Sequence, residues 1–369
     1  MTNREQQLLR WIEEDPMVSQ EELAQRAGIA RSSVAVHITN LIKKGYLAGK
    51  GYILRQAPYC VVVGGINMDI TGKSAEPLVA ADSNPGYVTM TLGGVGRNIA
   101  HNLRLMEADV RMLTAVGADA NGQRAMESCR SLGMDMSRAL QLSDCTTSTY
   151  LCICQPEGDM EIAISDMAIC DRITPEYLSA NKAVLQGAAI VVVDCNVPEE
   201  TIRYLAENIT APIYADPVST HKAGKLLPVL GKLHTLKPNA IEAEILSGVP
   251  IRCDDDLPKA ADALLGTGLQ RVFISLGSGG VYCADRHQKL HLKNLPGDMV
   301  NTTGCGDSFM AALVRAGMSG LSLQESGTLG LAAAGITMEY TGAINPRMNC
   351  DALMQRSGIQ LPALPTNKN

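Results

Sequence analysis

Residues 301–308, with the sequence NTTGCGDS, hold two glycines, a carboxylate and the start of an apolar helical pattern. Because Gly304 and Gly306 lack Cβ atoms, the backbone here can turn sharply and aim amide groups at one anion, beside the positive end of a helix. Asp307 at the rim of such a cradle could take a proton from a hydroxyl while the amides hold the charge on a transferred phosphoryl group. The octapeptide alone favours a simpler interpretation, a Gly-rich turn capped by Asp307, because short glycine motifs are weak signals.

Polar stretches also follow several apolar runs that we predict to be strands. Ligands of open α/β sheets bind beyond the carboxyl ends of the strands, so these stretches should gather at one edge. Their amides and carboxylates could ring a polyhydroxylated ligand, since such groups bind hydroxyls in pairs. The candidates are Asn67, Asp69, Asn98 and Asn196. Residues 64–69 and 93–98 do not fit GxGxxG, and no Walker sequence occurs, which argues against a dinucleotide-binding oxidoreductase and a P-loop NTPase.

Residues 57–362 alternate between apolar strands and helical segments, which predicts an α/β domain with a largely parallel sheet flanked by helices. The predicted strands are 60–63, 110–113, 189–193, 213–215 and 272–275, and the predicted helices lie near 96–106, 121–132, 198–208, 239–247 and 256–266. Two stretches, 70–92 and about 146–165, depart from this alternation and are rich in Thr, Ser and alternating apolar residues. We expect them to form a small β lid over the site. Residues 363–369 are expected to be a tail.

Residues 1–56 have helix signals and a different charge balance from the rest. Three amphipathic helices are predicted, the last from about residue 31 to 44, followed by a hairpin at 46–54. Between residues 31 and 55 there are five basic residues and no acidic one. This pattern resembles a winged helix-turn-helix module whose third helix enters a DNA major groove. We expect Arg31, Ser32, Ser33 and His37, with Asn40, near base edges and Lys43, Lys44 and Lys50 on phosphates. The alternative is a small helical domain whose basic face is solvated or contacts protein.

Composition narrows the class of protein further. The chain is 46% hydrophobic but only 4% aromatic, so base-stacking surfaces of the single-strand-binding kind are not expected. Its eleven cysteines include no CxxC pair, which argues against a disulfide framework and a structural zinc site. The polar N-terminus lacks a signal-peptide pattern and no apolar run reaches membrane-spanning length, so we expect a cytoplasmic protein.

Residues 58 to about 360 resemble the ribokinase family, also called PfkB carbohydrate and nucleoside kinases. Four motifs in the family's order carry the resemblance: GGVGRNIA at 93–100, PNAIE at 238–242, SLGSGG at 275–280 and TTGCGD at 302–307. Within the family, the sequence is similar to the pseudouridine kinases at residues 81–86, 164–167, 194–196, 216–219 and 234–239, and at Asn301. Ser165 stands where that branch is expected to have Asn.

The resemblance implies a role for each matching residue. Asp307 would be the base that accepts a proton from a sugar hydroxyl, and the amides of Gly304, Cys305 and Gly306 would form the anion hole. Asn239 and Glu242 would hold Mg²⁺ through water. The remaining implied contacts are Asn67, Asp69, Gly94 and Asn98 on ribosyl hydroxyls, with Asn196 nearby; Asp82, Asn84 and Asp166 of the lid over the base; and Asn239, Ser275, Gly277, Gly280 and Thr303 beside ATP.

Two residues of this chain differ from the family pattern. Cys305 replaces the usual Ala, and its amide could still serve the anion hole. Asn301 replaces an aspartate that helps relatives bind a monovalent cation, so dependence on K⁺ is left open. Residues 342–346 match the rest of that cation site only loosely.

Together these features predict an ATP-dependent kinase that phosphorylates the 5′-hydroxyl of a nucleoside, pseudouridine or a relative, joined to a DNA-binding domain. The first alternative is a transcription regulator whose kinase-like domain senses a nucleoside or sugar. The second is a free-pentose kinase; a ketohexose phosphate substrate is disfavoured because residues 76–96 contain no basic side chain. Relatives often pair through their lids and operators favour two-fold symmetry, so we expect a homodimer.

Overall fold

The computed structural model describes residues 1–47 and 57–365, and the chain divides into two compact units. One comprises Met1–Pro58 with Ala363–Asn369, and the other is Tyr59–Pro362. The hairpin predicted at 46–54, with its Lys50, lies largely outside the described residues. Among those residues, no helix is both long and apolar enough to cross a bilayer.

The first unit contains three helices, as predicted. They are α1 (Asn3–Glu14), α2 (Gln20–Ala27) and α3 (Arg31–Lys43). Each buries one apolar face, so that Leu8, Leu23 and Leu41 meet in a common core. Thr2 and Ser19 begin the first two helices by accepting bonds from backbone amides of the first turn, which removes unsatisfied donors there.

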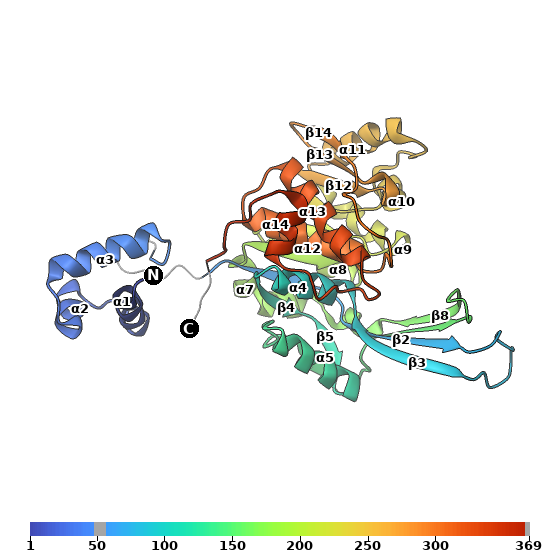
Figure 1. Ribbon diagram of the computed structural model, residues 1–369, viewed down its shortest axis with the longest axis horizontal. Helices are drawn as coiled ribbons and strands as arrows, with labels where there is room; N and C mark the ends of the chain where they lie inside the picture. Colours follow the sequence, from blue (N-terminus) through green and yellow to red (C-terminus); the bar gives the residue numbers. More distant parts are fainter. Residues whose placement is uncertain (48–56, 366–369) are drawn as a thin grey trace. The chain divides into compact units, whose positions relative to one another are not determined.

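The second unit is built on an eight-stranded sheet with the order β14-β13-β12-β11-β10-β9-β1-β4, flanked by helices (Figure 1). All neighbouring strands from β12 to β4 are parallel, whereas β13 and β14 pair antiparallel at one edge. The five predicted strands are confirmed; the edge pair was not predicted, because β14 alternates only two apolar residues with polar ones. The strands are β1 (Tyr59–Val63), β4 (Asp109–Leu113), β9 (Ile190–Asp194), β10 (Ile213–Asp216), β11 (Thr235–Leu236), β12 (Arg271–Ser275), β13 (Val281–Asp285) and β14 (Lys289–Leu292).

Helices connect the strands of this sheet. The five predicted helices are confirmed as α4 (Val95–Leu105), α5 (Ala120–Ser131), α8 (Glu199–Asn208), α10 (Ala240–Ser247) and α11 (Leu257–Gly266). The others are α6 (Pro175–Ala180), α7 (Lys182–Gln186), α9 (Thr220–Ala223), α12 (Cys305–Met318), α13 (Leu323–Met338) and α14 (Cys350–Ser357). Helix α12 packs against both α13 and α4. Because α12 begins at the glycine-rich octapeptide, this packing fixes the octapeptide beside the start of α4.

A second sheet, with the order β3-β2-β7-β8, projects from the main sheet and forms the predicted lid (Figure 1). Its strands are β2 (Asn67–Ser74), β3 (Gly86–Gly93), β7 (Thr149–Cys154) and β8 (Met160–Asp166). Strand β2 begins three residues before the predicted stretch, so Asn67 and Asp69 belong to the lid itself. A small sheet of β5 (Ala115–Gly117) and β6 (Leu140–Leu142) completes the unit.

Pairing separates the two faces of the lid. Asp69 is paired with Thr91 and Tyr150, and Tyr150 with Ser165, so these four side chains share one face. The opposite face is apolar, because the register there aligns Ile70, Val88, Met90, Leu151, Ile153, Ile162 and Ile164. Several of these side chains are more than half exposed, including Val88 and Ile164.

Candidate active site

The octapeptide forms the predicted turn into a helix. Gly304 has a φ of +80°, and a Cβ atom at this position would collide with the carbonyl oxygen of Ala343, so only glycine fits here. The Cys305 amide donates to the carbonyl of Thr302 at 3.2 Å. In the first turn of a helix the amides that follow, those of Gly306 and Asp307, have no intrahelical acceptor. These free amides could bind an anion, as expected. The amide of Cys305 is already bonded to Thr302 and would contribute less than predicted.

Asp307 lies in the first turn of α12, where its carboxylate meets the start of α4. Its Oδ2 accepts a hydrogen bond of 2.8 Å from Nδ2 of Asn98. Burial raises the pKa of Asp307 to about 7, and the carboxylate of Asp216 adds to this effect, while Asn98 and Lys237 oppose it. A carboxylate with a pKa near neutrality is suited to accept a proton from a hydroxyl and later release it.

The predicted hydroxyl-binding residues converge on the same place. Asn67 donates a hydrogen bond to Oδ1 of Asp69, and burial raises the pKa of the Asp69 carboxyl. A Cβ atom on Gly93 would collide with the Asp69 carboxylate. Gly94 has a φ of +97°, a conformation that other residues rarely adopt. The glycine pair of the first motif therefore lets the end of β3 pass closely by Asp69 and turn into α4.

Asp194 ties the glycine-rich segments together, although sequence reasoning gave it no role. It is fully buried at the end of β9, and its Oδ2 accepts from the amides of Gly65 at 3.0 Å and Gly96 at 2.7 Å. Oδ1 accepts from the amide of Asn196 at 2.9 Å. Burial raises the pKa of this carboxyl, against the effect of the amides. Asp194 thus fixes the loop after β1 and the start of α4 relative to each other through hydrogen bonds.

Lys237 was also missed, although a lysine directly before the PNAIE motif could have drawn attention; in the structure it follows β11. Its Nζ lies 3.2 Å from Oδ2 of Asp216, and both side chains are at most 8% exposed. A Cβ atom on Gly306 would lie 3.3 Å from this Nζ. A buried ammonium group therefore stands beside the amide cradle.

The PNAIE motif forms the start of α10. Asn239 Oδ1 accepts from the amide of Glu242 at 2.9 Å, and Glu242 Oε2 accepts from the amide of Asn239 at the same distance. These two bonds form a capping box, which leaves Glu242 Oε1 outside it. The buried Glu242 carboxyl has a raised pKa, chiefly because of burial. A carboxylate and an amide oxygen are donors that suit hydrated Mg²⁺, so the residues present fit the predicted metal.

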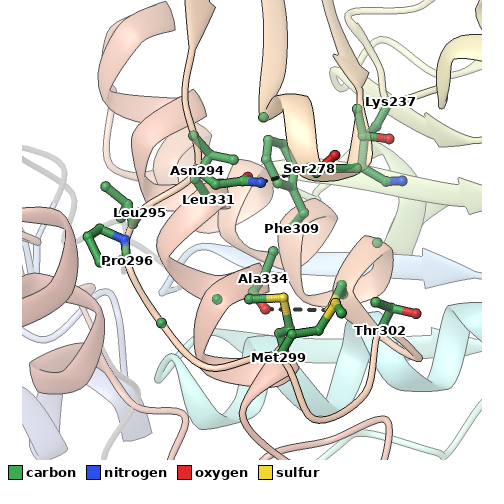
Figure 2. Close-up of a pocket in the computed structure, with 18 residues that line it drawn as sticks. Lys237, Ser278, Asn294, Leu295, Pro296, Met299, Thr302, Phe309, Leu331 and Ala334 are labelled. Atoms are coloured by element: carbon green, nitrogen blue, oxygen red, sulfur yellow. Dashed lines mark hydrogen bonds between the residues drawn. The ribbon is translucent and has the colours of Figure 1, made fainter.

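A cavity of about 480 Å³ adjoins the cradle (Figure 2). Lys237 and Thr302 lie at one end of it and Leu295 and Pro296 at the other (Figure 2). Of the predicted ATP residues, Ser275, Gly277 and Gly280 line the cavity, whereas Asn239 and Thr303 are not among the lining residues. The sequence did not predict the apolar wall formed by Leu295, Pro296, Met299, Phe309, Leu331 and Met338. One polar end and one apolar wall suit the phosphates and the base of a nucleotide.

Asn301 lies in the loop that leads into the cradle. Its Nδ2 donates to the carbonyl of Thr341 at 2.7 Å and its Oδ1 accepts from the amide of Thr303 at 3.0 Å. The neutral side chain therefore joins two loops through hydrogen bonds. The Cys305 thiol packs behind the cradle, 3.5 Å from the carbonyl of Ala334, and burial raises its pKa to about 11, which keeps it a neutral thiol.

The structure does not bring the predicted lid residues to the hydroxyl-binding cluster. Asp166 is paired with Thr149, and so it lies on the face of the lid opposite to Asp69; Ser165 occupies the expected face instead. A shift of one residue along a strand reverses its face, which sequence spacing alone did not determine. Asn84 bonds the backbone of Val79, with its Oδ1 2.7 Å from that amide. Asp82 similarly accepts from the amide of Ser83 at 2.7 Å, so both residues shape the tip of the lid.

Some of the predicted DNA-binding residues are exposed on α3, and others are half-buried or paired with a carboxylate of the same unit. Buried Val34, Ile38 and Leu41 define the inner face of α3, and helical spacing then places Ser32, Val36, Thr39 and Lys43 outward. Ser33 and His37 lie on the flank and are half-buried, and Arg31 lies 3.8 Å from Glu21. Lys44 Nζ donates to the buried carboxylate of Glu5 at 2.7 Å and 2.9 Å. The charge of Lys44 is therefore already paired within the unit, which weakens the prediction that it contacts a DNA phosphate.

The fold and the site are those of a phosphotransferase of the α/β class, with a carboxylate of raised pKa, a glycine-rich helix start and a cavity of about 480 Å³ at one edge of a parallel sheet. A family model described as pfkB family carbohydrate kinase matches residues 57–350, and the chain belongs to this family. It is an ATP-dependent sugar or nucleoside kinase. A model described as winged helix-turn-helix DNA-binding matches residues 1–48.

Several known proteins are similar to this chain over most of its length. An uncharacterized sugar kinase, YeiI of Escherichia coli (strain K12), is 38% identical over 355 residues, which cover 95% of this chain and 98% of the relative. Pseudouridine kinase of the same organism is 37% identical over 300 residues, covering 80% and 95%. The solved carbohydrate kinase from Agrobacterium tumefaciens is 27% identical with a TM-score of 0.72, covering 82% of this chain and 97% of its own. Ribokinase from Arabidopsis thaliana, solved with ribose and ATP, supports the fold alone at 22% identity and a TM-score of 0.74, covering 83% and 100%.

Proposed function

We propose that the protein transfers the γ-phosphoryl group of ATP to the 5′-hydroxyl of a nucleoside, pseudouridine or a close relative. The observation that carries the proposal is the Asp307–Asn98 contact at the mouth of the amide cradle. In this contact a carboxylate with a pKa near neutrality meets Asn98, one of the side chains proposed to bind the hydroxyls of the acceptor. The 37% identity to a pseudouridine kinase over nearly its whole length supports the choice of nucleoside.

In the proposed reaction the residues hold the acceptor and move one proton. Asn67, Asp69 and Asn98 bind the ribosyl hydroxyls and direct the 5′-hydroxyl toward Asp307. The Asp307 carboxylate takes the hydroxyl proton as the oxygen attacks the γ-phosphorus, and the bond from that phosphorus to the bridging oxygen of ADP breaks. The amides at the start of α12 stabilise the charge on the phosphoryl oxygens.

Kinases of this family use ATP and typically Mg²⁺. Asn239 and Glu242 would hold the ion through water molecules, with the carboxylate of Glu242 supplying the charge. Bound Mg²⁺ neutralises the phosphates of the nucleotide. The ATP base would lie against the apolar wall of the cavity.

The substrate is tested by measuring ADP formation with the purified protein and Mg²⁺-ATP over a panel of nucleosides and free sugars. Pseudouridine should give the largest kcat/KM, and its product should carry phosphate at the 5′ position. A larger kcat/KM for ribose than for every nucleoside would contradict the proposal. It would favour the free-pentose alternative.

We also propose that the first unit binds double-stranded DNA and couples the kinase to transcription. The match of a winged helix-turn-helix model to residues 1–48 and the outward-facing Lys43 support this role. Lys43→Ala should weaken binding uniformly across sequences and reduce the salt dependence of log K by about 1. An unchanged salt slope would contradict a phosphate contact at this position.

A nucleoside-sensing regulator is the second candidate, because the same chain carries both units. It would show a nucleoside-dependent change in DNA affinity without detectable ADP formation. Measuring both signals on one preparation separates it from the kinase.

A further inference from the structure

Lys237 stands where the main sheet meets the cradle. It follows β11 directly, and its backbone amide donates to the carbonyl of Ala215 at 3.2 Å, which fixes the start of the side chain. The ammonium group at the far end is 3.2 Å from Oδ2 of Asp216. Both charges are almost completely removed from water, and burying such a pair is costly unless it serves specificity or function.

The same ammonium group reaches the place where a phosphoryl group would lie. The separation of 3.3 Å between Nζ and the position of a Cβ on Gly306 puts it against the first turn of α12. In the cavity, Lys237 lies on the side opposite to Leu295 and Pro296 (Figure 2). Of the described residues that line the cavity, it is the one with a positive charge.

Carboxyl groups surround this end of the cavity. Asp216, Asp307 and Glu242 all act electrostatically on Lys237. A nucleotide triphosphate would add further negative charge. Coulomb interactions are strong where water is excluded, and so the ammonium group lowers the energy of any anion that enters.

We propose that Lys237 is a further catalytic residue, which donates a hydrogen bond to the phosphoryl group in transfer and is held by Asp216 in the absence of nucleotide. In the step described above, the acceptor proton goes to Asp307, the electron pair of the broken bond leaves with ADP, and Lys237 remains protonated throughout. Its ammonium group stabilises the charge that develops on the transferring oxygens. This inference rests on the proposed phosphoryl transfer, but not on which acceptor is used.

A purely structural role for the Lys237–Asp216 pair is the competing explanation, and a double variant distinguishes the two. Lys237→Met alone leaves the Asp216 carboxylate buried without its partner, so it can lose activity by unfolding. Lys237→Met combined with Asp216→Asn removes both charges and restores neutrality. The matched control is Lys259→Met, which breaks a Lys–Asp pair of 3.0 Å on the surface.

The kinetic measurement uses the full chain with Mg²⁺-ATP and the best acceptor found. We expect the double variant to regain wild-type resistance to urea but to keep a kcat about 10²–10³-fold lower, the loss typical of one such donor. The acceptor KM should stay within about threefold. A double variant with kcat restored to within about threefold of wild type would show that the pair is only structural.

A second readout needs no turnover. Thermal unfolding is followed with Mg²⁺-ADP alone and with Mg²⁺-ADP plus aluminium fluoride, which imitates the phosphoryl group in transfer. The wild type and Lys259→Met should gain additional Tm from the fluoride complex, and the double variant should not. An equal gain in the double variant, or none in the wild type, would overturn the role of Lys237. Absence of ADP formation with every acceptor would instead count against the proposed function, while this Tm comparison still decides on Lys237.

Discussion

Replacing Asp307 by Asn should lower turnover and raise the free energy of unfolding, and the pKa of Asp307 indicates the size of the second effect. The ordinary pKa of an aspartate is 3.8, and burial raises that of Asp307 to about 7. At pH values between 3.8 and about 7, Asp307 is protonated in the folded protein and ionised in the unfolded chain. The free energy of unfolding therefore falls as the pH rises through this range. Above about pH 7 the full penalty of ionising this partly buried group remains. A shift of this size corresponds to up to about 4 kcal/mol.

Asp307→Asn removes the ionisable group but keeps an oxygen that can accept from Asn98. We therefore expect the variant to be more stable than the wild type by up to about 4 kcal/mol at pH 8 and by about a third of that at pH 5. Turnover should fall by about 10²–10⁴-fold, because the proton acceptor is lost. In the wild type, kcat/KM should rise with pH through about 7 and then level off.

Urea unfolding at pH 5 and pH 8 measures the first effect and coupled ADP release measures the second. Asp255→Asn is the control, since it removes an exposed aspartate from the same unit. A stability difference that does not change with pH, or near-normal turnover, would refute the assignment of Asp307 as a base with a raised pKa.

Further predictions concern the other supports of the site and the two units. Asp194→Asn should lower the free energy of unfolding by about 1–3 kcal/mol and raise the nucleoside KM more than the ATP KM, since it loosens the substrate loop; equal changes in both KM values would contradict this. The pKa of Glu5 is lowered from 4.5 to about 2, chiefly by its bond with Lys44, so the first unit should lose stability as the pH falls from 4.5 toward 2. Glu5→Gln should abolish that dependence in a circular dichroism titration. We expect the apolar lid face to hold two copies of the chain together, so Ile164→Asp should give monomers in ultracentrifugation, because a buried charge in such an interface is unfavourable. An unchanged sedimentation coefficient would exclude this face as the interface.

The sequence by itself determined the local features of the protein. Runs such as 60–63 and 189–193 favour buried strands, because they are short, rich in valine and apolar on both faces. Glycines followed by Asp307 predicted a sharp turn into a helix, and the φ of Gly304 confirms it. These features depend only on residues that are close in the sequence, because the conformational preference of a residue affects the backbone over a few positions.

Only the tertiary structure decided which residues meet at the site. Asn98 and Asp307 are 209 positions apart, and the packing of α12 on α4 brings them within 2.8 Å. The same holds for Asp194, whose carboxylate holds two glycine loops, and for Lys237, whose partner lies at the end of another strand. Asp166 was expected in the lid over the base, and pairing places it on the face opposite to Asp69. The face of a strand residue depends on register, which is determined by pairing with distant strands. Burial matters for the chemistry as well: the sequence predicted Asp307 as the base, but only its enclosure raises the pKa to about 7.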